Sequence, residues 1–225
     1  MVSAPWNTAI NWETPAGRLL KRLAAGLPPD QAHRVTVFGS APIQLMIDES
    51  LLSGDVDVFS PNEELEELAR AAGLTAGQEE VCIQVSSELN FRTSPRWRDR
   101  TQTVTIGNCT FVFPHPIDIL LGKLTRLEEK DLEAFRVIRR ATGHPTEAEL
   151  IEELQAAVDL FRPAFDEEKP FDMAANCRRL WREMFVRDLD PRLEIIAPAL
   201  ARRREGYGDP PDYKTKLREM ADGQK

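Results

Sequence analysis

The spacing of apolar residues changes twice between residues 35 and 59. Val35 to Phe38 is a short apolar, β-branched run, which predicts a buried strand. Gly39-Ser40 interrupts it, and from Pro42 to Leu51-Leu52 the apolar positions follow a helical spacing, with Pro42 in the first turn. Asp55 to Phe59 then alternates acidic and apolar residues, as a strand with one polar face does. The stretch predicts a strand–helix–strand unit.

The rest of the chain predicts a small sheet followed by helices. Thr14 and Pro15 mark a helix start, Gly107-Asn108 a two-residue hairpin turn, and Pro198 should kink or split the last helix. We expect an α/β (α+β) fold with a small mixed sheet in residues about 30–115, a first domain of residues 1–142 and a helical C-terminal region of residues 143–225. The expected helices are 15–26, 63–73, 117–127, 130–142, 146–161, 173–188 and 191–204, and the expected strands are 81–85, 101–106 and 109–113.

Composition narrows the class of protein. The chain has 225 residues, 42% of them hydrophobic, which suffices for a packed core. A net charge of −8 argues against a general polyanion binder, although basic patches exist locally. No apolar run is long enough to span a bilayer, no signal peptide is evident, and Cys82, Cys109 and Cys177 form no metal or disulfide motif. These features predict a cytoplasmic protein without a membrane partner.

The acidic strand carries the candidate chemistry. Asp55 and Asp57 should point to one face of the strand, while Val56 and Val58 point to the other. Two neighbouring carboxylates repel each other unless a cation lies between them, and Mg²⁺ prefers such oxygen ligands. Gly39-Ser40 precedes a predicted helix, whose free N–H groups favour a phosphate. The competing interpretation is a polar strand end and an ordinary turn.

Two segments resemble a known fold. The Gly39-Ser40 turn, the helix and Asp55-x-Asp57 resemble the nucleotidyltransferase superfold of the polymerase-β type. Residues 115–135, HPIDILLGKLTRLEEKDLEAF, resemble a P-x-D-L-L-x-x-K-L…K-D-L segment of small bacterial nucleotidyltransferase-like proteins. Those proteins include uncharacterised families and toxins of toxin–antitoxin and abortive-infection systems.

The resemblance implies a function and a site. It implies transfer of a nucleoside monophosphate from a nucleoside triphosphate to a hydroxyl of RNA (tRNA included), a protein or a small molecule, with a cognate antitoxin or other protein as a partner. Asp55 and Asp57 would hold Mg²⁺ or Mn²⁺, Gly39 and Ser40 would hold phosphates with Lys123, and Asp131 would assist. The competing interpretation makes Lys123 a surface lysine and Asp131 a helix N-terminal charge.

One position departs from the resemblance. A third carboxylate often stands on the strand after the Asp-x-Asp strand, and this chain has Gln84 there. An amide carries no charge and is a weaker metal ligand than a carboxylate. Glu80 and Glu88 flank the strand without clearly replacing it; if the protein is an enzyme, Asp131 of the downstream motif is the first candidate for the missing acid and Glu88 the second. The alternative function is therefore a degenerate member of the fold that binds a nucleotide or a protein without turnover.

An arginine-rich loop gives a third hypothesis. Four arginines interleave with Phe91 and Trp97 between residues 89 and 101. Such a loop can bind phosphates and stack bases, which would suit an RNA-binding protein. The competing interpretation is a solvated loop anchored by a buried Trp. The arginines are Arg92, Arg96, Arg98 and Arg100.

Overall fold

The computed structural model describes residues 9–51, 53–76, 81–162 and 172–207. They form an α/β fold with a mixed five-stranded sheet and C-terminal helices, as expected. The strands are β1 (His33–Val37), β2 (Asp55–Phe59), β3 (Cys82–Val85), β4 (Gln102–Ile106) and β5 (Cys109–Phe113). The helices are α1 (Pro15–Gly26), α2 (Ala41–Met46), α3 (Leu65–Ala71), α4 (Pro116–Arg126), α5 (Glu129–Thr142), α6 (Glu147–Ala156), α7 (Met173–Phe185) and α8 (Ala197–Tyr207).

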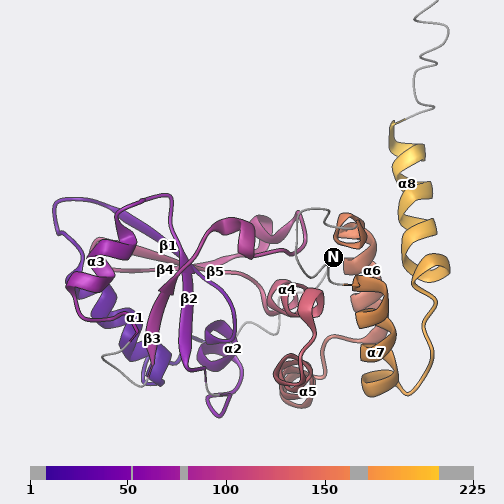
Figure 1. The fold of residues 1–225 in the computed structure, drawn as a ribbon, viewed down its shortest axis with the longest axis horizontal. Helices are drawn as coiled ribbons and strands as arrows, with labels where there is room; N and C mark the ends of the chain where they lie inside the picture. The colour runs from indigo at the N-terminus through magenta and orange to yellow at the C-terminus, as the bar shows by residue number, and fades with distance from the viewer. Residues whose placement is uncertain (1–8, 52, 77–80, 163–171, 208–225) are drawn as a thin grey trace, which may run out of the picture.

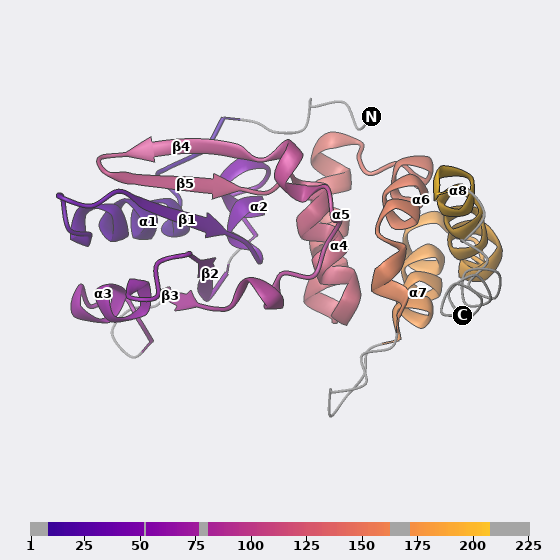
Figure 2. The same ribbon diagram turned by 90° about the horizontal axis from the view of Figure 1, so that it is seen from above.

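The sheet has the strand order β3-β2-β1-β5-β4. β1 is antiparallel to β2 and parallel to β5, and β2 is parallel to β3. β4 and β5 form the predicted antiparallel hairpin, with Gly107 at φ +59° in its turn. Figure 1 and Figure 2 show the sheet with α1–α3 at one end of an elongated molecule, α4 and α5 in the middle, and α6–α8 at the other end.

The two faces of the sheet belong to two different cores. The first core, which we call the sheet core, packs α1 and α3 against one face. The second, which we call the helical core, packs Phe38, Phe59 and Val112 against α4–α7. It includes residues on both sides of the expected boundary at 142, such as Phe135 and Trp181. The helical region therefore buries its apolar surface directly against the helices that follow the sheet.

Helix starts follow the sequence signals, but helix ends do so less well: the helix expected over 146–161 ends at Ala156, and a 3₁₀ turn, Val158–Phe161, follows it. Thr14 caps α1 by accepting a hydrogen bond from the Gly17 N–H, with Pro15 at the first position. The capping box of Thr146 and Glu149 opens α6. The helix expected to reach Leu51-Leu52 ends at Met46, because the Ile47 and Asp48 N–H groups both turn back to Ile43 O. Leu52 lies outside the described residues.

The last helix, which we expected Pro198 to kink or split, stays helical from residue 191 to 207 but changes from a π-helix to an α-helix just before Pro198. A proline has no N–H, so the carbonyl four residues earlier loses its helical partner. That carbonyl belongs to Glu194, and it accepts a hydrogen bond from Gln155 Nε2 at 2.7 Å. The turn before α8 widens into a π-helix over Arg192–Ile196. Gln155 lies on α6, so this hydrogen bond ties the π-helical segment before α8 to α6.

The arginine-rich loop is anchored by its aromatic residues. Phe91 and Trp97 are buried and pack edge to face at 5.5 Å, so they do not offer stacking surfaces to a base. This confirms the buried-Trp interpretation for the aromatic residues. Arg98 pairs with Glu88 and lies 4.6 Å from the Trp97 ring centroid. The loop is ordered by two 3₁₀ turns, Glu88–Asn90 and Trp97–Arg100.

Arg100 joins the sheet end to the helical region. It donates to both oxygens of Asp118 on α4, at 2.7 and 2.6 Å, and to both oxygens of Glu153 on α6, at 2.7 and 2.8 Å. Both acids are fully buried. Burial raises the pKa of Asp118 while the bonds from Arg100 oppose that rise. Arg100 is therefore a structural cation rather than an available phosphate contact.

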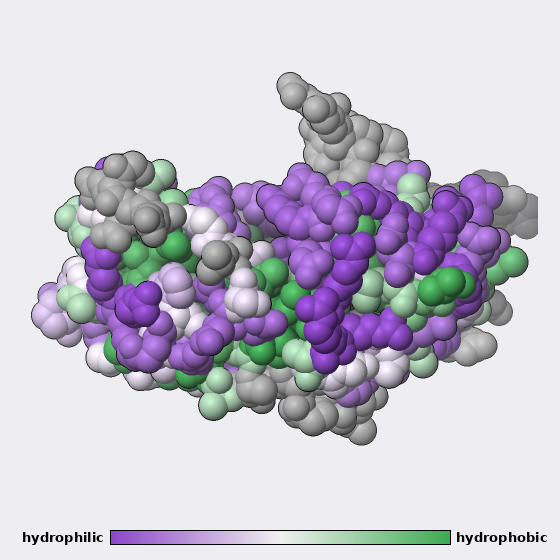
Figure 3. Space-filling model, turned by 90° about the horizontal axis from the view of Figure 1, so that it is seen from below, coloured by the Kyte–Doolittle hydropathy of each residue, from purple (hydrophilic) through white to green (hydrophobic). Residues whose placement is uncertain are grey.

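One face of the molecule is largely polar. Figure 3 shows hydrophilic side chains over most of the face seen there, with hydrophobic ones in separate patches. Among the described helices, none is both long and apolar enough to cross a bilayer.

We expect Arg100→Met to lower the free energy of unfolding by about 3–5 kcal/mol, because it leaves buried Asp118 without its cation and buried Glu153 with only the more distant, partly exposed Arg96. Urea denaturation measures this loss of stability, which should become smaller as the pH is lowered and Asp118, whose pKa is raised by burial, becomes protonated. Arg98→Met is the matched control: its side chain is 62% exposed, so the loss should stay below about 1 kcal/mol. Equal losses in the two variants would contradict the structural role of Arg100.

Candidate functional site

A cleft of about 610 Å³ lies between the sheet and α4. Asp55 and Asp57 line it from β2, and they are partly exposed, whereas Val56 and Val58 on the opposite face are fully buried. The predicted alternation along this strand is confirmed. The remaining described lining residues are Phe38, Gly39, Ser40, Leu51, Ser53, Gly54, Gln84, Ser86, Asn90, Phe91, Ile119, Gly122, Lys123, Thr125, Arg126 and Lys130.

The Gly39-Ser40 turn touches the acidic strand. The Phe38 N–H donates to Asp57 O at 3.0 Å, and Gly39 adopts φ +70°, a conformation that L side chains rarely adopt. A Cβ atom on Gly39 would lie 2.1 Å from Asp57 Oδ2. Only glycine therefore lets the turn and the carboxylate lie against each other. The turn predicted to bind phosphate and the predicted carboxylate pair therefore lie side by side.

The helix after this turn is shorter than expected. α2 has six residues, so its dipole is much weaker than that of the helix predicted to reach residues 51–52. The Ser40 side chain caps no N–H of α2 and instead accepts a hydrogen bond from Lys123 Nζ at 2.8 Å. Positive charge at this turn thus comes mainly from a side chain on α4.

The two carboxylates repel each other. Burial, followed by the charge of Asp55, raises the pKa of Asp57 to about 6. Lys123, Arg126 and Lys130 act in the opposite direction. Among the described residues no group of three or more His, Cys, Asp and Glu side chains could hold a metal ion. A hard cation bound at these two oxygen donors would relieve the repulsion and take its remaining ligands from water or phosphate.

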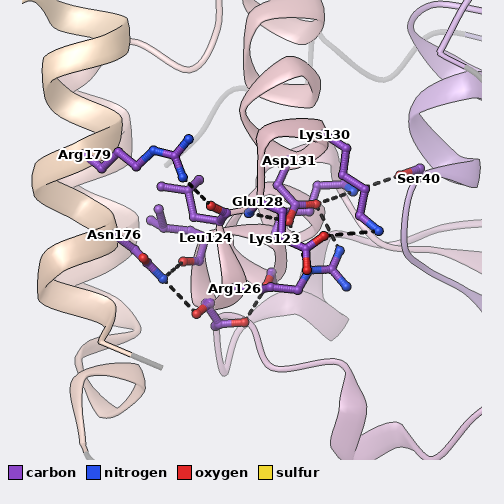
Figure 4. A network of polar contacts seen from close by, with 12 residues as sticks. Ser40, Lys123, Leu124, Arg126, Glu128, Lys130, Asp131, Asn176 and Arg179 are labelled. Carbon is purple, nitrogen blue, oxygen red and sulfur yellow. Dashed lines mark hydrogen bonds and ion pairs between the residues drawn. The ribbon is translucent and has the colours of Figure 1, made fainter. Parts of the chain in front are cut away.

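Lys123 is a buried cation rather than a surface lysine. Its side chain is 7% exposed, and Nζ lies 3.1 Å from Asp131 Oδ1 as well as 2.8 Å from Ser40 Oγ. Burial lowers the pKa of Lys123, and the charge of Asp131 opposes this. Figure 4 shows Lys123 reaching from α4 between Asp131 and Ser40. The surface-lysine interpretation is therefore wrong.

Asp131 is a helix N-terminal charge and also the partner of two cations. It completes a capping box with Glu128 at the start of α5 and accepts hydrogen bonds from Arg126 Nε and Nη2, each at 3.1 Å. Burial acts against ionisation, but the bond from Arg126 and the charge of Lys123 hold the pKa of Asp131 below its usual value. Such a carboxylate stays charged and is a weak proton acceptor.

Gln84 occupies the place where a third carboxylate was expected. It stands opposite Asp57 in the parallel register of β2 and β3, and it lines the cleft. Glu88, one of the two flanking acids, pairs with Arg98 and does not belong to the described lining. Glu80 lies outside the described residues. Among the residues that the structure describes, the cleft contains only the two acids of β2.

Sequence reasoning missed Arg126 and Lys130, which line the cleft beside Lys123. Arg126 lies three residues after Lys123, a spacing that places both on one helical face and could have revealed it. Lys130 is the lysine of the K-D-L segment quoted above, but we assigned it no role from the sequence. It reaches the same cleft because Leu127, at φ 46° and ψ 60°, ends α4 in a left-handed conformation and turns the chain into α5.

The mixed sheet carries a Gly-Ser turn that lies against two strand carboxylates, and cations from the two following helices line the same cleft. This arrangement defines a protein of the nucleotidyltransferase class. The chain belongs to the family described as "Nucleotidyltransferase of unknown function (DUF6036)", whose sequence model matches residues 18–180. The match spans the whole sheet and continues into α7. No curated protein and no solved structure matches the chain.

We expect Gly39→Ala to destabilise the protein more than Gly107→Ala does. Both glycines have positive φ, so both substitutions incur backbone strain of about 1–2 kcal/mol, but nothing lies within 4 Å of a Cβ at Gly107. The difference in unfolding free energy isolates the collision with Asp57. Adding Asp57→Ala should recover part of the loss at Gly39 and none at Gly107. Equal costs at the two glycines would contradict the close contact.

Proposed function

We propose that this protein is a divalent-cation-dependent nucleotidyltransferase that moves a nucleoside monophosphate from a nucleoside triphosphate to a hydroxyl. The supporting observation is the distribution of charge across the cleft. Asp55 and Asp57 form one wall, and three cations, Lys123, Arg126 and Lys130, lie on the other. A triphosphate bound to a divalent cation carries the complementary pattern, a cation at one end and excess negative charge at the other.

In this proposal each wall binds one part of the substrate. Asp55 and Asp57 hold Mg²⁺ or Mn²⁺, which when bound neutralises phosphate charge and helps align the attacking oxygen. Lys123, with Ser40 beside it, binds the β- and γ-phosphates. Gly39 keeps the turn bare of side chain so that phosphate oxygens can approach its backbone. The family supports the transferase class, and the cleft supports this division of roles.

Asp131 acts as a positioning residue in this proposal. It holds Lys123 and Arg126 through three hydrogen bonds and receives a fourth from the Glu128 N–H. A carboxylate with four donors and a lowered pKa is poorly suited to take a proton from an attacking hydroxyl. Its contribution is therefore to the affinity for the triphosphate.

For the acceptor, the proposal specifies only the reacting group, a hydroxyl. A hydroxyl of RNA, tRNA included, of a protein or of a small molecule would enter the cleft, which Gln84 and Asn90 also line. Arg96 does not line this cleft, and it lies 3.6 Å from the buried carboxylate of Glu153 on α6. A toxin–antitoxin or phage-defence setting, with an antitoxin as partner, remains a proposal that rests on the sequence resemblance.

Gln84 favours a second candidate function. A neutral amide in register with Asp57 can neither complete a second metal site as a carboxylate would nor act as a base. The same cleft could then bind a nucleotide without transferring it. Incubation with each labelled nucleoside triphosphate, Mg²⁺ or Mn²⁺ and total tRNA separates the two functions. Incorporation supports the transferase, and nucleotide binding without any incorporation supports the binder.

We expect Mg²⁺ or Mn²⁺ with a nucleoside triphosphate to raise the melting temperature. At concentrations of about 100 times Kd the rise should be roughly 5–10 °C, because a ligand that binds only the native state stabilises it by mass action. The double variant Asp55→Ala, Asp57→Ala should lose the rise. The control Glu63→Ala, Glu64→Ala removes two exposed acids away from the cleft and should keep it. An undiminished rise in the first variant would place the ligand elsewhere.

We expect Asp131→Asn to weaken nucleotide binding by about tenfold or more, because Lys123 and Arg126 lose their shared anion and their position. Calorimetric titration of wild type and variant measures this. The control Glu133→Gln on the same helix alters an exposed pair with Arg136 and should bind as wild type does. Unchanged binding together with a loss of turnover of ~10²-fold would instead make Asp131 an acid–base group.

A further inference from the structure

The end of α4 is the structural basis of the cationic wall. Lys123 and Arg126 lie in its last turn, and Lys130 is the second residue of α5, just after the chain turns. The last carbonyls of a helix have no partners within the helix and carry partial negative charge. Left unpaired, these carbonyls would oppose the binding of phosphate beside them. Their hydrogen bonds therefore matter for the site.

Two carbonyls near the end of α4 accept hydrogen bonds from donors in the same turn. Gly122 O accepts from Thr125 Oγ1 at 2.7 Å, and Lys123 O accepts from the Leu127 N–H at 2.8 Å. The carbonyls of Leu124, Thr125 and Leu127 also accept hydrogen bonds. Their donors come from a different part of the chain.

The donors come from α7. Asn176 Nδ2 donates to Leu124 O at 3.0 Å and to Thr125 O at 2.9 Å. Arg179 Nη1 donates to Leu127 O at 3.0 Å, and Arg179 Nη2 pairs with Glu129 at 2.8 Å. Figure 4 shows both side chains reaching from α7 to the turn between α4 and α5, on the side away from Ser40. One helix thus holds the end of α4 and the start of α5 together.

We propose that α7 braces the turn between α4 and α5, with Asn176 and Arg179 as positioning residues for the three cations of the cleft, Lys123, Arg126 and Lys130. The inference rests on the proposed function, because it assigns phosphate binding to these cations. None of the described residues that line the cleft belongs to α7. Its effect is therefore indirect: it fixes the turn that carries Lys123, Arg126 and Lys130, and its donors offset the partial negative charge of the carbonyls of Leu124, Thr125 and Leu127.

The brace should affect the two walls of the cleft differently. Asp55 and Asp57 lie on β2, whose position is set by its strand neighbours and by the sheet core. The two hydrogen bonds of Asn176 go to Leu124 O and Thr125 O, on the side of the turn away from Ser40. Loss of the brace should weaken binding of a polyphosphate and leave binding of a metal ion alone unchanged. A general loss of folding would weaken both.

The test compares Asn176→Asp with wild type. The variant keeps the size of the side chain but replaces the donor with a carboxylate facing two carbonyls. We expect inorganic tripolyphosphate with Mg²⁺, titrated by calorimetry, to bind about tenfold more weakly. The affinity for Mn²⁺ alone, measured by electron paramagnetic resonance, should stay within about twofold. Hydrogen exchange should quicken at the amides of Leu127 and Asp131 and stay unchanged in β2.

Arg179 provides a second variant with a matched control on the same helix. Arg179→Ala should weaken tripolyphosphate binding, and Arg179→Lys should restore part of it by keeping the charge beside Glu129. Arg182→Ala removes an equal charge whose only described partner is exposed Asp188, and it should bind as wild type does. These variants keep the test decisive if Asn176→Asp fails to fold.

The outcomes separate the inference from the function on which it rests. If wild type binds tripolyphosphate and both Asn176→Asp and Arg179→Ala bind it equally well, the brace is overturned and the proposed function stands. If wild type binds neither tripolyphosphate nor any nucleoside triphosphate, the proposed function fails and the inference fails with it. Parallel losses of Mn²⁺ and tripolyphosphate affinity would show a general structural role and also overturn the brace.

Discussion

Folding takes the ammonium group of Lys123 out of water, and the arrangement of the cleft depends on how that charge is compensated. A buried cation is costly unless polar partners surround it. Here the partners come from two directions, Ser40 after β1 and Asp131 at the start of α5. The lysine thereby links the sheet to the two helices beyond it. Asp131 in turn holds Arg126, so a single compensated charge orders most of the cationic wall.

A second charge, the partly buried Arg100, also compensates buried groups, near the start of α4. It satisfies one acid on α4 and one on α6, and both acids are inaccessible to water. Together with the helical core, this ties the region after residue 142 to the part that contains the cleft. The family match, which continues to residue 180, covers these same elements through the first half of α7.

Local signals in the sequence predicted most of the fold. The alternation of Asp55 and Asp57 with valines, the Thr14 cap and the hairpin at Gly107 each depend on neighbouring residues, and each is found as expected. The predicted end of α2 was wrong, because the apolar spacing continues past Met46 whereas the helical pattern of backbone hydrogen bonds ends there. For the site, sequence pointed to the two acids, Gly39, Ser40 and Lys123, whose roles stay predictions. The burial of Lys123 and the contacts from α7 depend on residues about 50 to 80 positions apart, which no local pattern reveals.

The left-handed residue Leu127 has a consequence for the length of the chain. Only Leu127 and Glu128 separate α4 from α5, so the rotational phase of one helix is fixed relative to the other. A residue inserted into a helix turns everything after it by about 100°. Surface connections generally accept added residues. An insertion at this one would carry Lys130 and Asp131 away from Lys123, so among relatives we expect the spacing between these positions to be kept even where their neighbours differ.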